Sequence, residues 1–151
     1  MYFCIFMIDH MKVYILNNIY KGAQVNDLLH ILAPTSPEIN EQRLLGLLAD
    51  ESFLLFVAEG ADGGLSGMLT LTCCQTLARS KYWIEDVVVR PEFRGQGIGR
   101  ALVEAAIGHV RETCGQASIY LTSNLSRQAA RALYRSVGFE DYDTGVFKIE
   151  I

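Results

Sequence analysis

Apolar residues recur along the chain with two different spacings, and the changes between them predict the order of the secondary structure elements. Helical spacing is found in residues 24–32, 37–48, 97–113 and 127–138. Alternation or short apolar runs of strand length are found in residues 12–16, 53–59, 65–77, 82–89, 117–123 and 146–149. The predicted order is β-α-α-β-β-β-α-β-α-β, which is a mixed α/β (α+β) fold.

Residues between these segments supply the expected helix boundaries. Ser36 is suited to cap a helix whose first residue is Pro37. Gly115 is placed to stop the helix over residues 97–113. The strand, helix and strand over residues 82–122 predict a right-handed parallel crossover.

Composition and charge indicate one packed domain and exclude several classes of protein. Of the 151 residues, 50% are apolar and 20% are charged, which is usual for a globular domain, so we expect a single domain over residues 1–151. With a net charge of -4, the chain lacks the excess of basic residues that is typical of nucleic-acid-binding proteins. The histidines and cysteines lack metal-ligand spacing, so no metal is expected, and free thiols suit a cytoplasmic protein.

The start of the chain is apolar up to Ile8 and then reaches Asp9 and His10. This run is far shorter than the ~18 residues needed to span a bilayer, and it lacks the features of a signal peptide. We therefore expect no membrane partner. Because the strand pattern resumes at Lys12, Met11 is a candidate biological start, with residues 1–10 an upstream extension.

The clearest chemistry lies in residues 82–102, where a strand is followed by a glycine-rich turn and a helix. The turn contains Arg94, Gly95, Gly97, Gly99 and Arg100. Glycines let the backbone approach a ligand closely, and the free N–H groups of a helix N-terminus attract anions. The expected ligand is a phosphate or pyrophosphate, and a tight connection without a ligand is the structural alternative.

Two common phosphate motifs fail here, and a third pattern fits. Arg100 stands where G-x-G-x-x-G requires its third glycine, and no Gly-Lys-Ser/Thr follows for a P-loop. Residues 94–99 resemble the acetyl-coenzyme A motif of the GNAT superfamily of N-acetyltransferases, written Q/R-x-x-G-x-G/A. Residues 121–139 are similar to the family's second signature. The resemblance implies the GNAT acyl-CoA N-acyltransferase fold and an acetyl-CoA-dependent N-acetyltransferase, an acyltransferase of EC class 2.3.1.

The resemblance also implies where acetyl-CoA would bind as a co-substrate. Its pantetheine arm would enter between the strands at 82–89 and 117–123, and its pyrophosphate would lie on the glycine turn. The implied contacts are Val87, Val88, Val89, Arg94, Gly95, Gln96, Gly97, Ile98, Gly99, Arg100, Asn124 and Arg127. For Asn124 the alternative is a turn or helix-capping residue, and for Arg127 it is a solvated helix face.

Amine attack on a thioester requires a neutral amine, so a base is expected. Glu85 is the candidate, acting through water as in some members of the family, because a carboxylate inside an apolar strand is unusual. An ion pair or substrate binding is the alternative. Strand alternation places Asp86 on the opposite face. By resemblance, Tyr134 is the acid that protonates the departing thiolate, and an ordinary core tyrosine is its alternative.

The expected reaction is direct transfer to a small-molecule amine or a protein amino group in a ternary complex. A non-catalytic acyl-CoA-binding or regulatory module on the same fold is the alternative. By resemblance, acceptor choice would depend on residues 24–50, 73–81 and 140–146. The sequence does not decide between a monomer and a homodimer.

Overall fold

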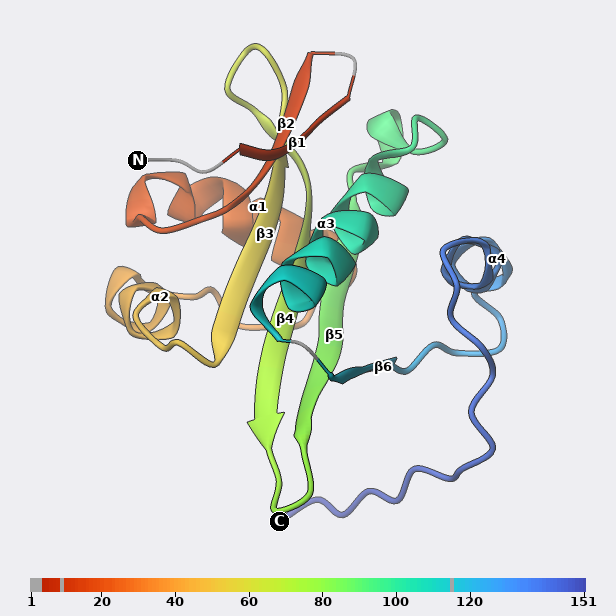
Figure 1. Ribbon diagram of the computed structural model, residues 1–151. Coiled ribbons are helices and arrows are strands. Elements are labelled where there is room, and N and C mark those ends of the chain that lie inside the picture. Colours follow the sequence, from red (N-terminus) through yellow and green to blue (C-terminus); the bar gives the residue numbers. More distant parts are fainter. Residues whose placement is uncertain (1–3, 9, 115) are drawn as a thin grey trace.

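The computed structural model describes residues 4–8, 10–114 and 116–151, and these form a six-stranded sheet with helices on both faces (Figure 1). The strands are β1 (Cys4–Ile8), β2 (Met11–Ile15), β3 (Phe53–Glu59), β4 (Leu65–Gln75), β5 (Ser80–Val89) and β6 (Ser118–Leu121). The helices are α1 (Gly22–Leu32), α2 (Glu41–Leu48), α3 (Ile98–Thr113) and α4 (Gln128–Ser136), with 3-10 turns η1 (Ile19–Lys21) and η2 (Pro91–Phe93). Neighbouring strands are antiparallel except β5 and β6, which are parallel. The predicted mixed α/β fold class is confirmed.

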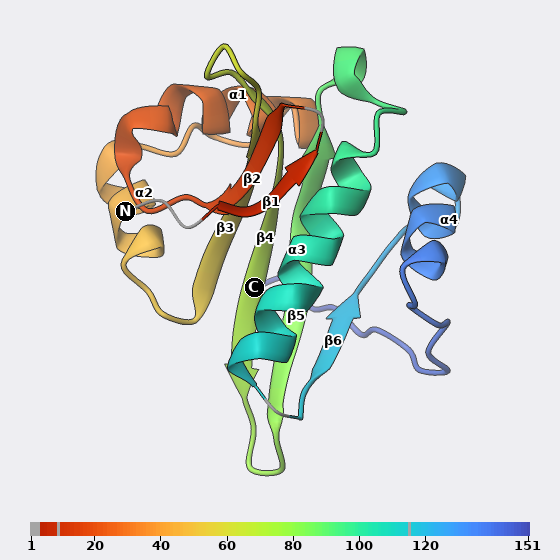
Figure 2. The same cartoon turned by 45° about the horizontal axis from the view of Figure 1, so that its top comes forward.

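Two hydrophobic cores lie on the two faces of the sheet. Side chains alternate along β3, so that Leu55 and Val57 pack with α1 and α2, whereas Phe56 and Ala58 pack with α3. Figures 1 and 2 show α1 and α2 on one side of the sheet and α3 crossing the other. No helix in the described part of the chain is long and apolar enough to cross a membrane.

The end of the chain differs from the prediction. Residues 146–149 form no strand in the described C-terminal segment, and Phe147 and Ile149 are 97% and 84% exposed. A segment with strand propensity becomes a strand only when it pairs with an edge. Here the chain leaves α4 through Asp141, whose carboxylate accepts hydrogen bonds from Arg131 and Arg135, and it does not pair with β6.

The start of the chain also differs. Residues 4–8, for which no strand was predicted, pair antiparallel with β2 and add an edge strand. The second helix begins later than predicted, because Asn40 rather than Ser36 caps it and accepts a hydrogen bond from the Arg43 N–H at 2.8 Å. The predicted helix stop at Gly115 lies outside the described residues.

Strand β5 contains a β-bulge in its second half. The register pairs on either side of it are Met68–Val88 and Thr70–Glu85. They enclose one residue of β4 but two residues of β5, Asp86 and Val87, and Asp86 takes a left-handed conformation with φ of 50°. Pairing of β5 with β6 ends at Ile84–Leu121, so the bulged half of β5 faces no described strand on that side.

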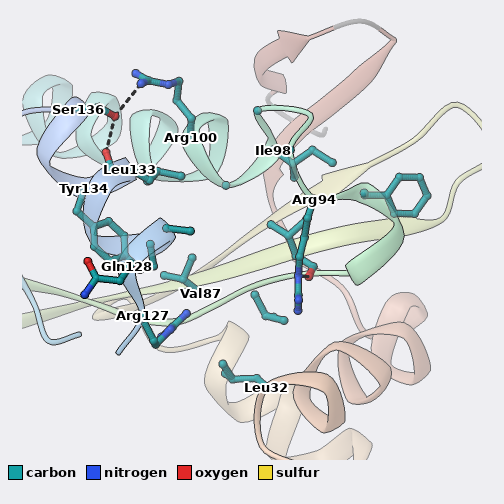
Figure 3. A pocket seen from close by; sticks show the side chains of 18 of the residues that line it. Leu32, Val87, Arg94, Ile98, Arg100, Arg127, Gln128, Leu133, Tyr134 and Ser136 are labelled. Carbon is teal, nitrogen blue, oxygen red and sulfur yellow. Dashed lines mark hydrogen bonds between the residues drawn. The ribbon is translucent and has the colours of Figure 1, made fainter. Parts of the chain in front are cut away.

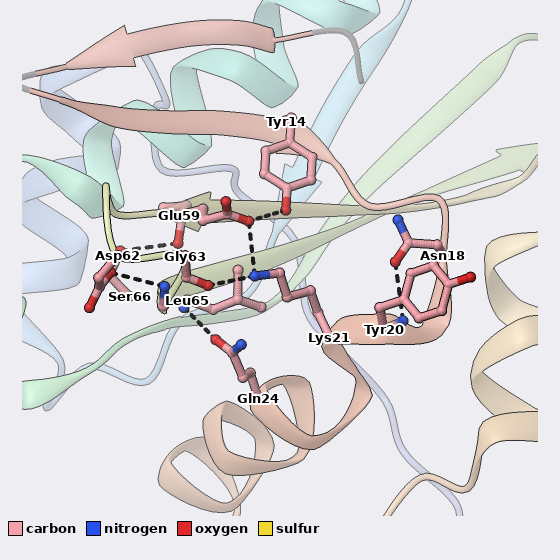
Figure 4. A network of polar contacts seen from close by, with 12 residues as sticks. Tyr14, Asn18, Tyr20, Lys21, Gln24, Glu59, Asp62, Gly63, Leu65 and Ser66 are labelled. Carbon is pink, nitrogen blue, oxygen red and sulfur yellow. Dashed lines mark hydrogen bonds and ion pairs between the residues drawn. The ribbon is translucent and has the colours of Figure 1, made fainter. Parts of the chain in front are cut away.

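A polar network fixes the start of α1 to the turn between β3 and β4 (Figure 4). The Lys21 ammonium lies 3.3 Å from the Glu59 carboxylate and donates a hydrogen bond to the Gly63 carbonyl. The Leu65 N–H donates to the Gln24 side chain at 2.6 Å. From this anchor α1 runs across the sheet toward β5, with which it makes extensive contact. The C-terminal end of α1 is thereby brought to the bulge.

Gly67 of β4 lies where α3 packs closely on the sheet. A Cβ atom there would lie 2.9 Å from the Val88 carbonyl oxygen and 3.2 Å from Leu102 Cδ1. We expect Gly67→Ala to lower the free energy of unfolding by about 1–3 kcal/mol through overpacking. Gly108→Ala in α3, where a Cβ meets nothing within 4 Å, should instead raise it by up to about 1 kcal/mol. Urea denaturation of both variants measures the two changes in the free energy of unfolding. Equal changes in the two variants would contradict the prediction.

Candidate active site

A cavity of about 880 Å³ lies between the bulged half of β5, the N-terminus of α3, the end of α1 and helix α4 (Figure 3). Its volume is in the range of small-molecule sites. The sequence-predicted residues that line it are Val87, Val88, Val89, Arg94, Gly95, Gly97, Ile98, Gly99, Arg100, Arg127 and Tyr134. The structure thus brings together two motifs that are about thirty residues apart in the chain.

The glycine turn has the geometry of an anion site. Gly95 and Gly97 have φ of 78° and 80°, which non-glycine residues rarely adopt. Gly97 caps α3 without any side-chain hydrogen bond, so the first N–H groups of the helix remain available. A Cβ atom on Gly95 or Gly97 would meet nothing within 4 Å, so the space where a side chain would lie is open at both positions. These features fit a pyrophosphate.

Gly99 has a different role from the other two glycines. A Cβ atom there would lie 3.3 Å from Leu133 Cδ1 of α4, so the small residue allows α3 and α4 to approach each other. Gly99, the third glycine of the motif, therefore allows two helices that line the cavity to pack together, and it does not form part of the turn.

The arginines around the cavity divide into paired and available groups. Arg100 lies 3.1 Å from the Glu104 carboxylate and donates to Ser136 Oγ at 2.7 Å. Arg94 donates through Nε to the Val89 carbonyl at 3.1 Å, which leaves the rest of its guanidinium available. Arg127 lines the cavity as well, and within the described residues neither Arg94 nor Arg127 forms an ion pair. These two cations are therefore the best placed to bind phosphate groups.

Tyr134 is 6% exposed and lies on the α4 side of the cavity (Figure 3). Burial raises the pKa of its phenol, and the positive charge of Arg127 opposes that shift. Its ring packs edge-on against Phe139, with 6.1 Å between centroids. Tyr134 is thus held as a neutral phenol that is able to donate a proton or hydrogen bond into the cavity.

Glu85 faces the side of the sheet that carries α1 and α2. It lies opposite Thr70 in the register, and directly opposed residues share a face. Partial burial raises the pKa of the Glu85 carboxyl, and the neighbouring charge of Asp86 raises it further. Glu85 does not line the large cavity itself, and the described residues give its carboxylate no hydrogen-bond or ion-pair partner.

The expected opposite orientation of Asp86 is wrong. Its Oδ2 accepts a hydrogen bond from Thr70 Oγ1 at 3.0 Å, and Asp86 lines a cavity beneath α1 and α2. The bulge explains the difference, because a residue in the left-handed conformation interrupts strand alternation. Asp86 therefore lies on the same face as Thr70 and Glu85.

Two predicted coenzyme contacts lie outside the lining of the cavity. The Gln96 side chain donates to the Glu92 carbonyl at 3.3 Å. Asn124 Oδ1 accepts hydrogen bonds at 2.9 Å from the N–H and the hydroxyl of Ser126, which is the turn role that was its structural alternative.

Several lining residues were not predicted from the sequence. They are Ile31, Leu32, Phe93, Ser126, Gln128, Ala129, Ala130, Leu133 and Ser136. The apolar stripe of the last helix was a signal for Ala130 and Leu133. No local pattern could have found Ile31 and Leu32, because their position depends on how α1 crosses the sheet.

Comparison with known proteins identifies the family. The model of the acetyltransferase (GNAT) family matches residues 25–139, which is most of the chain and includes both motifs. The chain belongs to the GNAT family. Proteins with this fold use acetyl-CoA, and the open glycine turn with its two available arginines fits that group.

Several GNAT relatives are similar over different parts of the chain. A streptothricin acetyltransferase of Streptomyces lavendulae is 39% identical over 85 residues, which is 56% of this chain and 43% of that protein. The ribosomal protein bS18-alanine N-acetyltransferase of Escherichia coli K12 is 41% identical over 56 residues, 37% of each chain. The chain thus spans less than half the length of these curated relatives. A putative acetyltransferase from Agrobacterium tumefaciens superposes with a TM-score of 0.79 at 27% identity, covering 92% of this chain and 99% of that one.

The division among the arginines predicts their contributions to coenzyme binding. Arg94→Gln and Arg127→Gln should each weaken binding of coenzyme A about tenfold, because each removes a charge-assisted contact to phosphate. Isothermal titration at two salt concentrations measures the affinity and its reduced salt dependence. Arg111→Gln, on an exposed part of α3 outside this cavity, is the matched control and should bind normally. Unchanged affinity in both test variants would place the phosphates elsewhere.

Proposed function

We propose that this GNAT protein is an N-acetyltransferase that moves an acetyl group from acetyl-CoA to a primary amine by direct attack in a ternary complex. The observation that carries the proposal is one cavity lined by the glycine turn, the opened half of β5 and Tyr134. A binding module needs only the first two features. A buried neutral phenol in the same cavity supports chemistry as well.

Residues of this chain would bind and orient the coenzyme from two sides. Acetyl-CoA supplies an activated acetyl thioester. The amides that follow Gly95 and Gly97, together with Arg94 and Arg127, bind its phosphates. The bulged half of β5 faces no described strand on its β6 side, which supports a role for backbone groups near Val87 in pairing with the pantetheine arm and polarising the thioester carbonyl.

Glu85 and Tyr134 would handle the protons of the reaction. An acceptor ammonium must lose a proton before its nitrogen can attack, and Glu85 takes up that proton through a water molecule. As the new N–C bond forms and the C–S bond breaks, Tyr134 donates its phenolic proton to the departing sulfur, and the proton that the acylated nitrogen then loses restores the phenol. The raised pKa of Glu85 strengthens it as a base, and burial keeps Tyr134 protonated.

The acceptor is a small-molecule amine or a protein amino group. The named relatives support both classes, because one is a streptothricin acetyltransferase and another a ribosomal protein bS18-alanine N-acetyltransferase. Thiol release over a panel of amines, amino acids, aminoglycosides and peptides tests the activity. Binding of coenzyme A without release for any acceptor would support the non-catalytic alternative.

Replacing the proposed acid tests the chemistry separately from binding. Tyr134→Phe should lower kcat by about a hundredfold and leave the affinity for coenzyme A unchanged, because only the proton donor is lost. Stopped assays of thiol release measure kcat, and titration calorimetry measures the affinity for coenzyme A. Tyr20→Phe, at an 88% exposed tyrosine, is the matched control. If Tyr134→Phe retained full turnover, Tyr134 would be a packing residue.

The proposed base predicts a pH profile. Since the pKa of Glu85 is raised, kcat/KM should fall as pH drops through that raised value, because the carboxyl becomes protonated and cannot accept a proton. Glu85→Gln should lose about a hundredfold in kcat/KM and should no longer show this acidic limb. Glu51→Gln, an exposed position between α2 and β3, should keep the unmodified profile. An acidic limb that survives in Glu85→Gln would assign the titration to another group.

A further inference from the structure

A second cavity, of about 310 Å³, lies beneath α1 and α2 on the sheet face that carries Glu85. Its walls are mostly apolar. They comprise Val25, Leu29, Ile39, Leu44, Leu47, Phe53, Leu55 and Met68. Its polar lining residues are Glu38, Arg43 and Asp86, which are exposed, Ser36, which is half-buried, and Thr70, which is buried.

The segment that covers this cavity is held in place by hydrogen bonds within the protein. The connection between α1 and α2 passes over it, and the Asn26 side chain makes two hydrogen bonds to the backbone of Ile39, at 2.8 and 3.0 Å. Val25, Leu44 and Leu55 are almost completely buried around it. The cavity is thus a preformed apolar space of small-molecule size.

Asp86 is an exposed carboxylate where this space meets β5. One of its oxygens accepts the Thr70 hydroxyl at 3.0 Å, and the other has no partner among the described residues. The next residue, Val87, lines the coenzyme cavity. Asp86 therefore stands where the apolar cavity meets the strand that would hold the acetyl group.

We propose that Asp86 positions the acceptor by binding its ammonium group, and that the body of the acceptor fills the apolar cavity. The acceptor is then a compact primary amine with a mainly hydrocarbon body, such as an arylalkyl or alkyl amine, rather than a polyhydroxylated one. This inference rests on the proposed acetyltransferase function. Asp86 acts before the chemistry, by holding the amine beside Val87, and Glu85 remains the proton acceptor.

A competing space of about 610 Å³ follows β6 and also touches Tyr134. Its walls include Trp83, whose ring stacks on Tyr120 at 5.2 Å, and the exposed Glu140. Arg131 and Arg135 line it as well and already bind the Asp141 carboxylate at 2.9 and 2.7 Å. An incoming ammonium would meet Glu140 there beside two arginines that are paired with Asp141, whereas the cavity at Asp86 offers an unused carboxylate oxygen next to mostly apolar walls.

Two charge-neutralising variants separate the two locations. Asp86→Asn preserves the side-chain shape and the bond to Thr70, and asparagine tolerates the left-handed conformation. We expect it to lower kcat/KM for 2-phenylethylamine at least about tenfold, mainly through KM, with unchanged binding of coenzyme A. Glu140→Gln, in the competing space, is the matched control and should have no effect. The reverse pattern, a loss in Glu140→Gln only, would overturn the proposal.

Acceptor size and polarity give a second measurement. The unmodified protein should turn over 2-phenylethylamine and hexylamine at least tenfold more efficiently than ethylamine, glucosamine or kanamycin. Leu47→Phe extends a half-buried side chain into the cavity and should raise KM for 2-phenylethylamine more than for ethylamine. A preference for glucosamine or kanamycin that Leu47→Phe leaves unchanged would contradict the proposal.

Failure of this inference can be told from failure of the proposed function. If no amine at all promotes thiol release, the acetyltransferase function fails. If amines are acetylated but Asp86→Asn leaves kcat/KM unchanged for all of them, only the proposed role of Asp86 fails. Calorimetric titration of 2-phenylethylamine into the unmodified protein and Asp86→Asn gives a readout without turnover, and equal affinities would also overturn the inference.

Discussion

The arrangement of this protein's candidate active site depends on one extra residue in β5. At the bulge, two residues of β5 lie opposite one residue of β4. The second half of β5 therefore bends, and its side chains point to the opposite faces from those that regular alternation would give. The bend coincides with the end of pairing to β6, so backbone groups that would otherwise be used within the sheet can bind a ligand. The same bulge places Asp86 on the α1 and α2 face. One local irregularity thus opens the strand where we propose that the coenzyme binds and places a carboxylate where we propose that the acceptor binds.

The position of helix α3 also contributes to the candidate active site. The chain leaves β5 through η2 and the glycine turn, so the N-terminus of α3 lies beside the opened strand. Its position on the sheet is fixed by the close approach at Gly67, and its position against α4 by the close approach at Gly99. The free N–H groups and the phenol of Tyr134 therefore reach the same cavity because two glycines allow tight packing. The charges agree with this geometry, since Arg94 and Arg127 line the cavity and have no acidic partner among the residues that the structure describes.

The features that the sequence predicted correctly are those set by local structure. A glycine turn before a helix has its geometry wherever it occurs, so the turn over residues 94–97 and the helix that follows it could be predicted without knowing the rest of the fold. The orientation of Asp86 could not, because a bulge arises from the register between two strands and leaves no signature in the apolar pattern of β5. The strand expected at residues 146–149 failed for a related reason, since its alternation describes a segment able to pair but does not supply an edge. The contribution of Ile31 and Leu32 depends on the path of α1, which is anchored far away by Lys21, Gln24 and the β3–β4 turn.

The two carboxylates of β5 have roles that their environments can separate. Asp86 already accepts one hydrogen bond and stands at the end of an apolar cavity, which suits it to hold a cation. The pKa of Glu85 is raised by burial and by the charge of Asp86, which suits it to accept a proton. When an ammonium group binds beside Asp86, it neutralises the charge that helps raise the pKa of Glu85, so acceptor binding lowers that pKa and favours the ionised form of the base. The acceptor would in this way help to prepare the carboxylate that deprotonates it.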